Sequence, residues 1–183
     1  MSQSNCGDQL VLLAATLAIT ISKGLSADEI RTLKTDDIEY HDGIMKLNLK
    51  DRMVEIKDEE VIYDVKKTVE QDEYYIYGSS GRKEQFRKMK QTPYLIKPVV
   101  TRVGKKDTVT NPSLLLKNVL SKLEDTIPGI DLDKITLEDI RRSRIISLFK
   151  KGRSMSEVKD ILGKRAECDL YWLQEIALTI KNK

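Results

Sequence analysis

The sequence predicts an α+β fold in which helices dominate and one small antiparallel sheet interrupts them. Apolar residues recur at helical spacing over most of the chain, whereas between residues 38 and 58 they alternate with polar residues. Charged residues make up 33% of the 183 residues and aromatic residues 5%, a composition typical of a soluble, helix-rich protein. This length is enough for one sizeable core, so we expect a single domain over residues 1–183.

The first predicted helix, Gln9–Ile21, is apolar almost all round. It is too short to span a bilayer, and Asp8 and Lys23 flank it closely. No basic residue precedes it, as a signal peptide would require. We therefore expect a buried core helix that ends at Gly24, and no membrane partner.

A short helix and the sheet follow. Ser26 and Glu29 have the spacing of a capping box, which predicts a helix beginning there and continuing to Lys34. Residues 38–58 alternate apolar and polar side chains around turn signals at Asp42-Gly43 and Lys50-Asp51. This pattern indicates antiparallel hairpins.

The middle of the chain is less clearly patterned. Helical spacing returns over residues 61–69, residues 73–77 resemble a short strand, and Asn111-Pro112-Ser113 opens a helix over residues 114–123. Residues 82–106 contain nine Lys or Arg residues and one Glu. This run fits either a solvated helix face followed by a loop, or a surface that contacts phosphates.

The last third has three predicted helices. Thr136 and Asp139 cap a helix that ends at Gly152, and Ser154 and Glu157 cap a helix that ends at Gly163. An amphipathic pattern over residues 170–180 predicts the final helix.

Charge and cysteine content narrow the function classes. Residues 1–80 contain 9 Lys and Arg against 16 Asp and Glu, whereas residues 81–183 contain 23 against 13. The basic second half favours a polyanionic partner. Cys6 and Cys168 lack metal-ligand spacing, and His41 is the only histidine, so we expect neither metal nor cofactor. Cysteine usage of this kind suits a reducing cytoplasm.

Three motifs occur in a familiar order. Lys23-Gly24-Leu25-Ser26-Ala27-Asp28-Glu29 corresponds to Thr-Gly-Leu-Arg-x-x-Glu, Glu138-Asp139-Ile140-Arg141 to His-x-x-Arg, and Leu162-Gly163-Lys164 to Leu-Gly-His. Together with the hairpins and a following tyrosine, this order resembles the catalytic domain of the tyrosine recombinases, the phage-integrase family, over about residues 10–175. The separate N-terminal DNA-clamping domain of that family is not expected within these 183 residues.

The resemblance implies a tyrosine that attacks a DNA phosphate and forms a covalent phosphotyrosyl intermediate, which is then rejoined. Two arginines stabilise the phosphate oxygens, while a hairpin lysine and histidines move protons. The matching catalytic candidates are Arg141, Lys50, Lys164 and Tyr171. Ser26 stands in place of the first arginine and Glu138 in place of the histidine, so we expect impaired or lost strand cleavage. Arg31, just over one helical turn after Ser26, is a candidate substitute for the first arginine, although nothing in the sequence requires it to take that role.

The expected partner is double-stranded DNA. Candidate phosphate-contacting residues in the basic half are Arg82, Lys83, Arg87, Lys88, Lys90, Arg142, Arg144 and Arg165. Exchange of C-terminal helices between protomers is common in the resembled family, and the helix beginning at Leu170 is apolar enough to dock on a neighbour. The resemblance therefore also implies a homo-oligomer on DNA.

Two alternatives stay open. Ile145–Leu162, with Gly152 in the turn, fits a helix-turn-helix whose second helix would direct Arg153, Lys159, Lys164 and Arg165 at a major groove. Such a regulator does not need the hairpins of residues 38–58. The third hypothesis is a protein-interaction module that retains only the fold.

Overall fold

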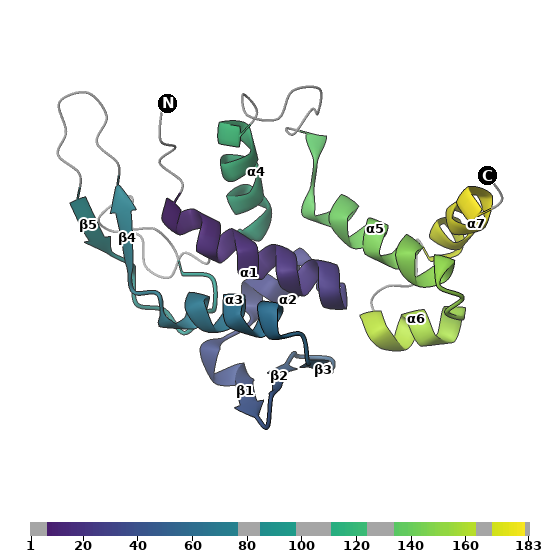
Figure 1. Cartoon of the computed structure of the whole chain (residues 1–183), viewed down its shortest axis with the longest axis horizontal. Helices are drawn as coiled ribbons and strands as arrows, with labels where there is room; N and C mark the ends of the chain where they lie inside the picture. Colours follow the sequence, from purple (N-terminus) through teal and green to yellow (C-terminus); the bar gives the residue numbers. More distant parts are fainter. Residues whose placement is uncertain (1–6, 77–84, 98–110, 124–133, 164–169, 182–183) are drawn as a thin grey trace.

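A computed structural model describes residues 7–76, 85–97, 111–123, 134–163 and 170–181. It confirms the α+β class: the described residues form mostly helices, one three-stranded antiparallel sheet and one two-stranded antiparallel pair. Figure 1 shows helix α1 (Gly7–Lys23) crossing the middle of the molecule. It packs against α3 (Glu59–Glu70), α4 (Pro112–Leu123), α5 (Leu137–Lys150) and strand β4 (Glu73–Ile76). The predicted buried helix is therefore the centre of the fold.

The capping box after α1 forms as predicted, but the helix ends at Thr32 instead of Lys34, and a 3-10 turn that was not predicted follows it. Gly24 has a φ of +68°, the left-handed conformation in which glycine commonly ends a helix. Ser26 then caps α2 (Ala27–Thr32), and the complete capping box with Glu29 is present. A 3-10 turn, Thr35–Asp37, leads into the sheet.

The three-stranded sheet is a simple meander of β1 (Ile38–His41), β2 (Ile44–Asn48) and β3 (Met53–Ile56). Asp42 and Gly43 both have positive φ, the geometry of a two-residue hairpin turn. Met45 faces Ile56 and Leu47 faces Val54 across β2 and β3, and all four side chains are buried. The alternation in the sequence thus places one face of the sheet in the core.

The region 82–106 differs from the predicted helix face. Gln85–Lys88 is a strand, β5, which pairs antiparallel with β4 so that Glu73 lies opposite Lys88. The helical interpretation is wrong for these residues, because pairing with a strand earlier in the chain overrides the local preference. Residues 98–106 lie outside the described residues.

Two hydrophobic clusters support the two parts of the molecule. The larger cluster joins α1, α2, the sheet, α3 and α4, and includes Ile19, Ile30 and Leu116. The smaller cluster joins the second half of α5 to α6 (Met155–Leu162) and α7 (Leu170–Lys181), and includes Phe149, Val158 and Leu173. Figure 1 shows α5 extending from the first part to the second, with α6 and α7 at the far end.

Candidate functional site

A hollow lies where α2, α4 and α5 begin, and its lining includes Ser26 and Glu138, two of the positions at which the sequence departs from the recombinase motifs. Its volume is about 450 Å³. The lining residues are Ser26, Ala27, Asp28, Arg31, Asn111, Ser113 and Glu138. Residues 23–29 and 138–141 are more than 100 positions apart in the sequence, so the fold brings the two motifs together. The described lining carries two carboxylates against one guanidinium, which opposes binding of an anion.

The Ser26 side chain is committed to the helix that it opens. Its Oγ accepts from Glu29 N at 3.3 Å and donates to Glu29 Oε2 at 3.0 Å, while its own backbone N–H donates to the same Oε2 at 2.7 Å. The serine that the motif comparison pairs with the first arginine is therefore a helix cap. Arg31, the candidate substitute, pairs with Asp28 at 3.0 Å on the exposed surface.

Arg141 lies beside the hollow and binds the protein itself. Its side chain is 13% exposed, and its Nε donates to the backbone oxygen of Gly24 at 2.9 Å. Its Nη1 lies 3.4 Å from Glu138 Oε1. The guanidinium thus covers a carbonyl just after α1, and the carboxylate in place of the family histidine competes for its remaining donors.

Arg52, which the sequence analysis did not single out, has the best-buried ion pair of the region. Its Nε and Nη2 lie 2.8 and 3.2 Å from the two carboxylate oxygens of Glu29, and its Nη1 donates to the carbonyl of Ile161. Only 9% of the side chain is exposed. Arg52 therefore joins the sheet to α2 and α6. Two features of the sequence could have pointed to Arg52. It lies two residues after the hairpin lysine, Lys50, and Glu29 matches the glutamate of the first recombinase motif.

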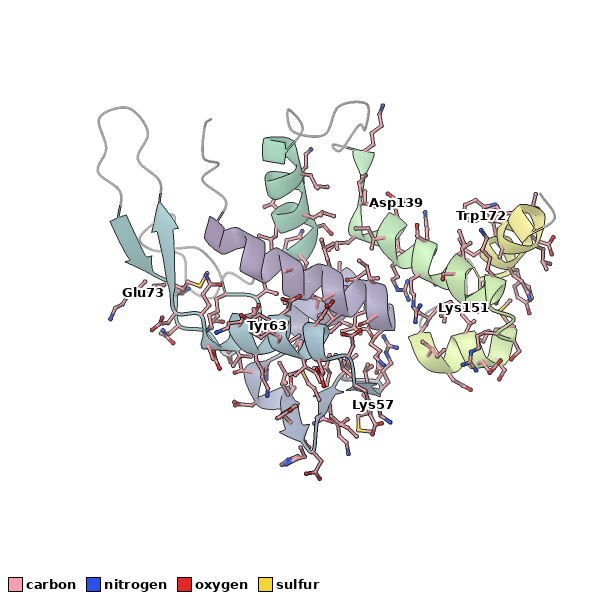
Figure 2. All side chains as sticks on the ribbon, viewed as in Figure 1. Lys57, Tyr63, Glu73, Asp139, Lys151 and Trp172 are labelled. Atoms are coloured by element: carbon pink, nitrogen blue, oxygen red, sulfur yellow. The ribbon has the colours of Figure 1, made fainter. Side chains whose placement is uncertain are left out.

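Two other catalytic candidates, Lys50 and Tyr171, are not among the residues that line the hollow. Lys50 lies in the turn between β2 and β3 with an exposed side chain. Tyr171 begins α7 and is 68% exposed, whereas its neighbours Leu170 and Leu173 are buried against α5. Figure 2 shows the adjacent Trp172 at the far end of the molecule. Lys164 lies outside the described residues.

The candidate phosphate-contacting residues divide into three groups. On α5, Arg142 lies 3.7 Å from Glu138, and Arg144 Nη2 donates to the Ser22 carbonyl at 3.1 Å. Near β5, Lys88 is exposed and Lys90 is half-buried. Arg82, Lys83 and Arg165 lie outside the described residues, as does the side chain of Arg87.

One basic residue of the 82–106 run is unavailable to DNA. Lys97 is only 7% exposed, and its Nζ donates to the carbonyls of Val69 and Gln71 at 2.8 and 2.6 Å. Burial lowers the pKa of this amine. Lys97 therefore caps the end of α3 and is not part of a solvated or phosphate-binding face.

Comparison with known proteins identifies the family. The family model described as the MrpR C-terminal catalytic domain matches residues 4–161. The chain belongs to this family. No curated protein matches the sequence.

The MrpR C-terminal catalytic domain family is of the tyrosine recombinase type, and a solved structure agrees with that fold. The crystal structure of XerA recombinase superposes on the chain with a TM-score of 0.57 at 16% sequence identity. The match covers 98% of this chain and 61% of the XerA chain, so the chain spans less than two thirds of that protein. The tyrosine recombinase catalytic-domain fold predicted from the motifs is confirmed. Within the described residues, no helix is long and apolar enough to cross a membrane.

Proposed function

We propose that this protein binds double-stranded DNA through a tyrosine recombinase-type domain whose strand-cleavage activity is impaired or lost. The family match and the fold support the recombinase relationship. The observation that carries the loss of cleavage is the hollow, where Ser26 and Glu138 stand at the positions of an arginine and a histidine.

The chemistry of phosphoryl transfer explains why these replacements matter. A transition state at phosphorus concentrates negative charge on the non-bridging oxygens, and preorganised donors stabilise it. Removing one such donor from an enzyme costs about 3–4 kcal/mol of activation free energy. The chain lacks the first arginine and presents a carboxylate at Glu138, so these two changes alone predict a rate lower by a factor of about 10⁴ or more.

The position of Tyr171 supports the same conclusion. A nucleophile must come within about 3–3.5 Å of the phosphorus, with its base or stabilising donors at hydrogen-bond distance. Tyr171 is instead 68% exposed on α7, and it is absent from the residues that line the hollow. Cleavage by Tyr171 at the hollow of its own chain would require α7 to move.

Fluorescence anisotropy across a salt series tests this function. It measures DNA binding by the wild type, by Arg141→Ala and by Lys50→Ala. We expect wild-type affinity to fall steeply with salt, because each neutralised phosphate contributes about 0.9 to the slope of log K against log salt. Weaker binding by either variant would show that the inherited site still contacts DNA. An equally folded Arg141→Ala, checked by circular dichroism, is required because Arg141 also holds the Gly24 carbonyl.

A nicked DNA substrate tests the cleavage component separately. A covalent intermediate would be trapped as a protein–DNA adduct, and Tyr171→Phe is the matched control. We expect no adduct from either protein. Efficient adduct formation that requires the Tyr171 hydroxyl would refute the loss of cleavage.

A protein-interaction surface is the second candidate, favoured by the outer face of α7. Tyr171, Trp172, Leu178 and Ile180 are each between 47% and 68% exposed there, although α7 already packs on α5 through its other face. Exposed large apolar side chains on one helix fit a contact with another protein, including a second copy of the chain. Absence of DNA binding at low salt would favour this candidate over the first. The helix-turn-helix alternative is less favoured, because the described chain has the three-stranded sheet that such a regulator does not need.

A further inference from the structure

Three cations lie around the end of α1, and none of them is among the residues that line the hollow. Lys23 is the last residue of α1, Lys57 follows β3, and Arg144 lies on α5. Arg144 reaches the end of α1, since its Nη2 donates to the Ser22 carbonyl at 3.1 Å. Figure 2 shows Lys57 below that end of α1.

Two of these positive charges act on the third, Lys23. Partial burial is the largest cause of a lowered pKa at Lys23, and repulsion from Arg144 and Lys57 lowers this pKa further. Glu55 and Asp58 act on Lys23 in the opposite direction. The fold thus holds like charges close together at a partly desolvated place, an arrangement that an anion would relieve.

The two nearby carboxylates have other partners. Asp58 Oδ1 caps α3 by accepting from the backbone N–H groups of Glu60 at 3.1 Å and Val61 at 3.3 Å. Glu55 lies 3.9 Å from Lys46 across the sheet. Among the residues that the structure describes, no carboxylate forms an ion pair with Lys23, Lys57 or Arg144.

The same place contains polar atoms without hydrogen-bond partners. The Oγ of Ser22 and the Nε of Arg144 are buried, and neither has a partner in the described part of the chain. Both can donate to an oxygen. The negative end of the α1 dipole does not oppose an anion strongly here, because Arg144 and Arg141 cover the carbonyls of Ser22 and Gly24.

We propose that Lys23, Lys57 and Arg144 form a binding site for a phosphate group, distinct from the inherited catalytic hollow. The site lies at the surface, since Lys57 is exposed, and a surface cluster of cations suits one phosphate of a polymer backbone. The phosphodiester of double-stranded DNA is the source that we infer, and this step rests on the proposed function. Contacts of this kind position DNA without reading its sequence.

DNA affinity across a salt series tests the site with the double variant Lys23→Gln/Arg144→Gln and with Lys57→Gln. The exposed Lys57 provides a variant that leaves the packing of α5 on α1 untouched. Lys67→Gln is the matched control, because Lys67 is an exposed lysine on α3 near Glu70. We expect the double variant to bind more weakly and its salt slope to fall by about 1, the loss of one phosphate contact. Lys57→Gln should weaken binding in the same direction, and Lys67→Gln should match the wild type.

Wild-type slope and affinity in both site variants would overturn the proposal. A titration of the protein with inorganic phosphate, followed by the NMR shifts of the Ser22 and Lys23 amides, separates this site from the proposed function. Phosphate-dependent shifts that the double variant loses would support the phosphate site even if the wild type binds no DNA, in which case the proposed function fails alone. Absence of such shifts in the wild type, together with absence of DNA binding, would overturn both.

Discussion

Replacing Arg52 by methionine should destabilise the protein far more than an ordinary ion-pair deletion. The guanidinium makes two contacts with the Glu29 carboxylate, at 2.8 and 3.2 Å, and a third with the Ile161 carbonyl. Breaking a buried ion pair costs about 3–5 kcal/mol. Glu29 keeps its two contacts with Ser26 and is 26% exposed, so we expect a loss of about 2–4 kcal/mol in the free energy of unfolding.

Urea denaturation followed by circular dichroism measures this loss, and Arg153→Met is the matched control. Arg153 also contacts a glutamate, with Nη1 2.7 Å from Glu157, but its side chain is 56% exposed. Solvent screens an exposed pair of this kind, so its loss should change the free energy of unfolding far less than the loss of the Arg52 pair. The two variants therefore make the same chemical change at a buried and an exposed position.

A double-mutant cycle with Glu29→Gln assigns the energy to the contact itself. Glutamine can retain the capping box with Ser26 but cannot form the ion pair. We expect a coupling energy of about 1–3 kcal/mol between Arg52 and Glu29. An Arg52→Met protein within about 0.5 kcal/mol of the wild type would refute the argument that this pair joins the sheet to α2 and α6.

Two further predictions concern the surroundings of Arg52 and the end of α3. Gly163→Ala should lower the free energy of unfolding, measured by urea denaturation, by at least about 1 kcal/mol more than Gly43→Ala. Both glycines have positive φ, so both substitutions strain the backbone. A Cβ at Gly163 would also lie 2.9 Å from Arg52 Cδ, whereas the space at Gly43 is open. Equal losses would show that Arg52 gives way. Lys97→Met should lower the free energy of unfolding by about 1–3 kcal/mol at pH 7, because two carbonyls at the end of α3 lose their donor. Folding lowers the pKa of Lys97 from its ordinary value of 10.5, so the unfolded chain binds more protons just below that pH. The wild type therefore gains stability as the pH rises toward 10.5. A Lys97→Met protein with the same pH dependence would contradict this assignment.

Features that depend on neighbouring residues were predictable from the sequence. The capping boxes at Ser26, Thr136 and Ser154 all form, since each needs only residues three positions apart. The meander of β1, β2 and β3 was predictable for the same reason, with Asp42-Gly43 setting the first turn. Local hydrogen bonds and short turns fix these elements before any long-range contact exists.

Features that depend on distant contacts were not predictable in the same way. Strand β5 exists because Gln85–Lys88 pairs with β4, and no residue within the strand specifies that pairing. In the sequence Lys97 cannot be distinguished from the surface cations of its run, because its hydrogen-bond acceptors lie at the end of α3. Arg52 likewise acquires its importance from Glu29 and Ile161, which are 23 and 109 positions away.

The candidate site shows the same division. Ser26 and Glu138 line one hollow, and Glu138 lies 3.4 Å from Arg141 because the two are three positions apart on α5. The sequence did not reveal that Arg141 donates to Gly24, because a backbone carbonyl has no residue type that a motif can record. The roles of Lys50 and Tyr171 stay predictions.

The contacts of Arg141 show that an arginine at a recombinase motif position can serve packing within the protein. In an active site of this type a guanidinium must offer its donors to a phosphate. Here Nε donates to Gly24 at the junction of α1 and α5, so the side chain also supports the packing of the two helices. This contact gives Arg141 a structural role that does not depend on DNA cleavage. An arginine in the expected motif position is therefore weak evidence for catalysis, and its partners in the structure are the better guide.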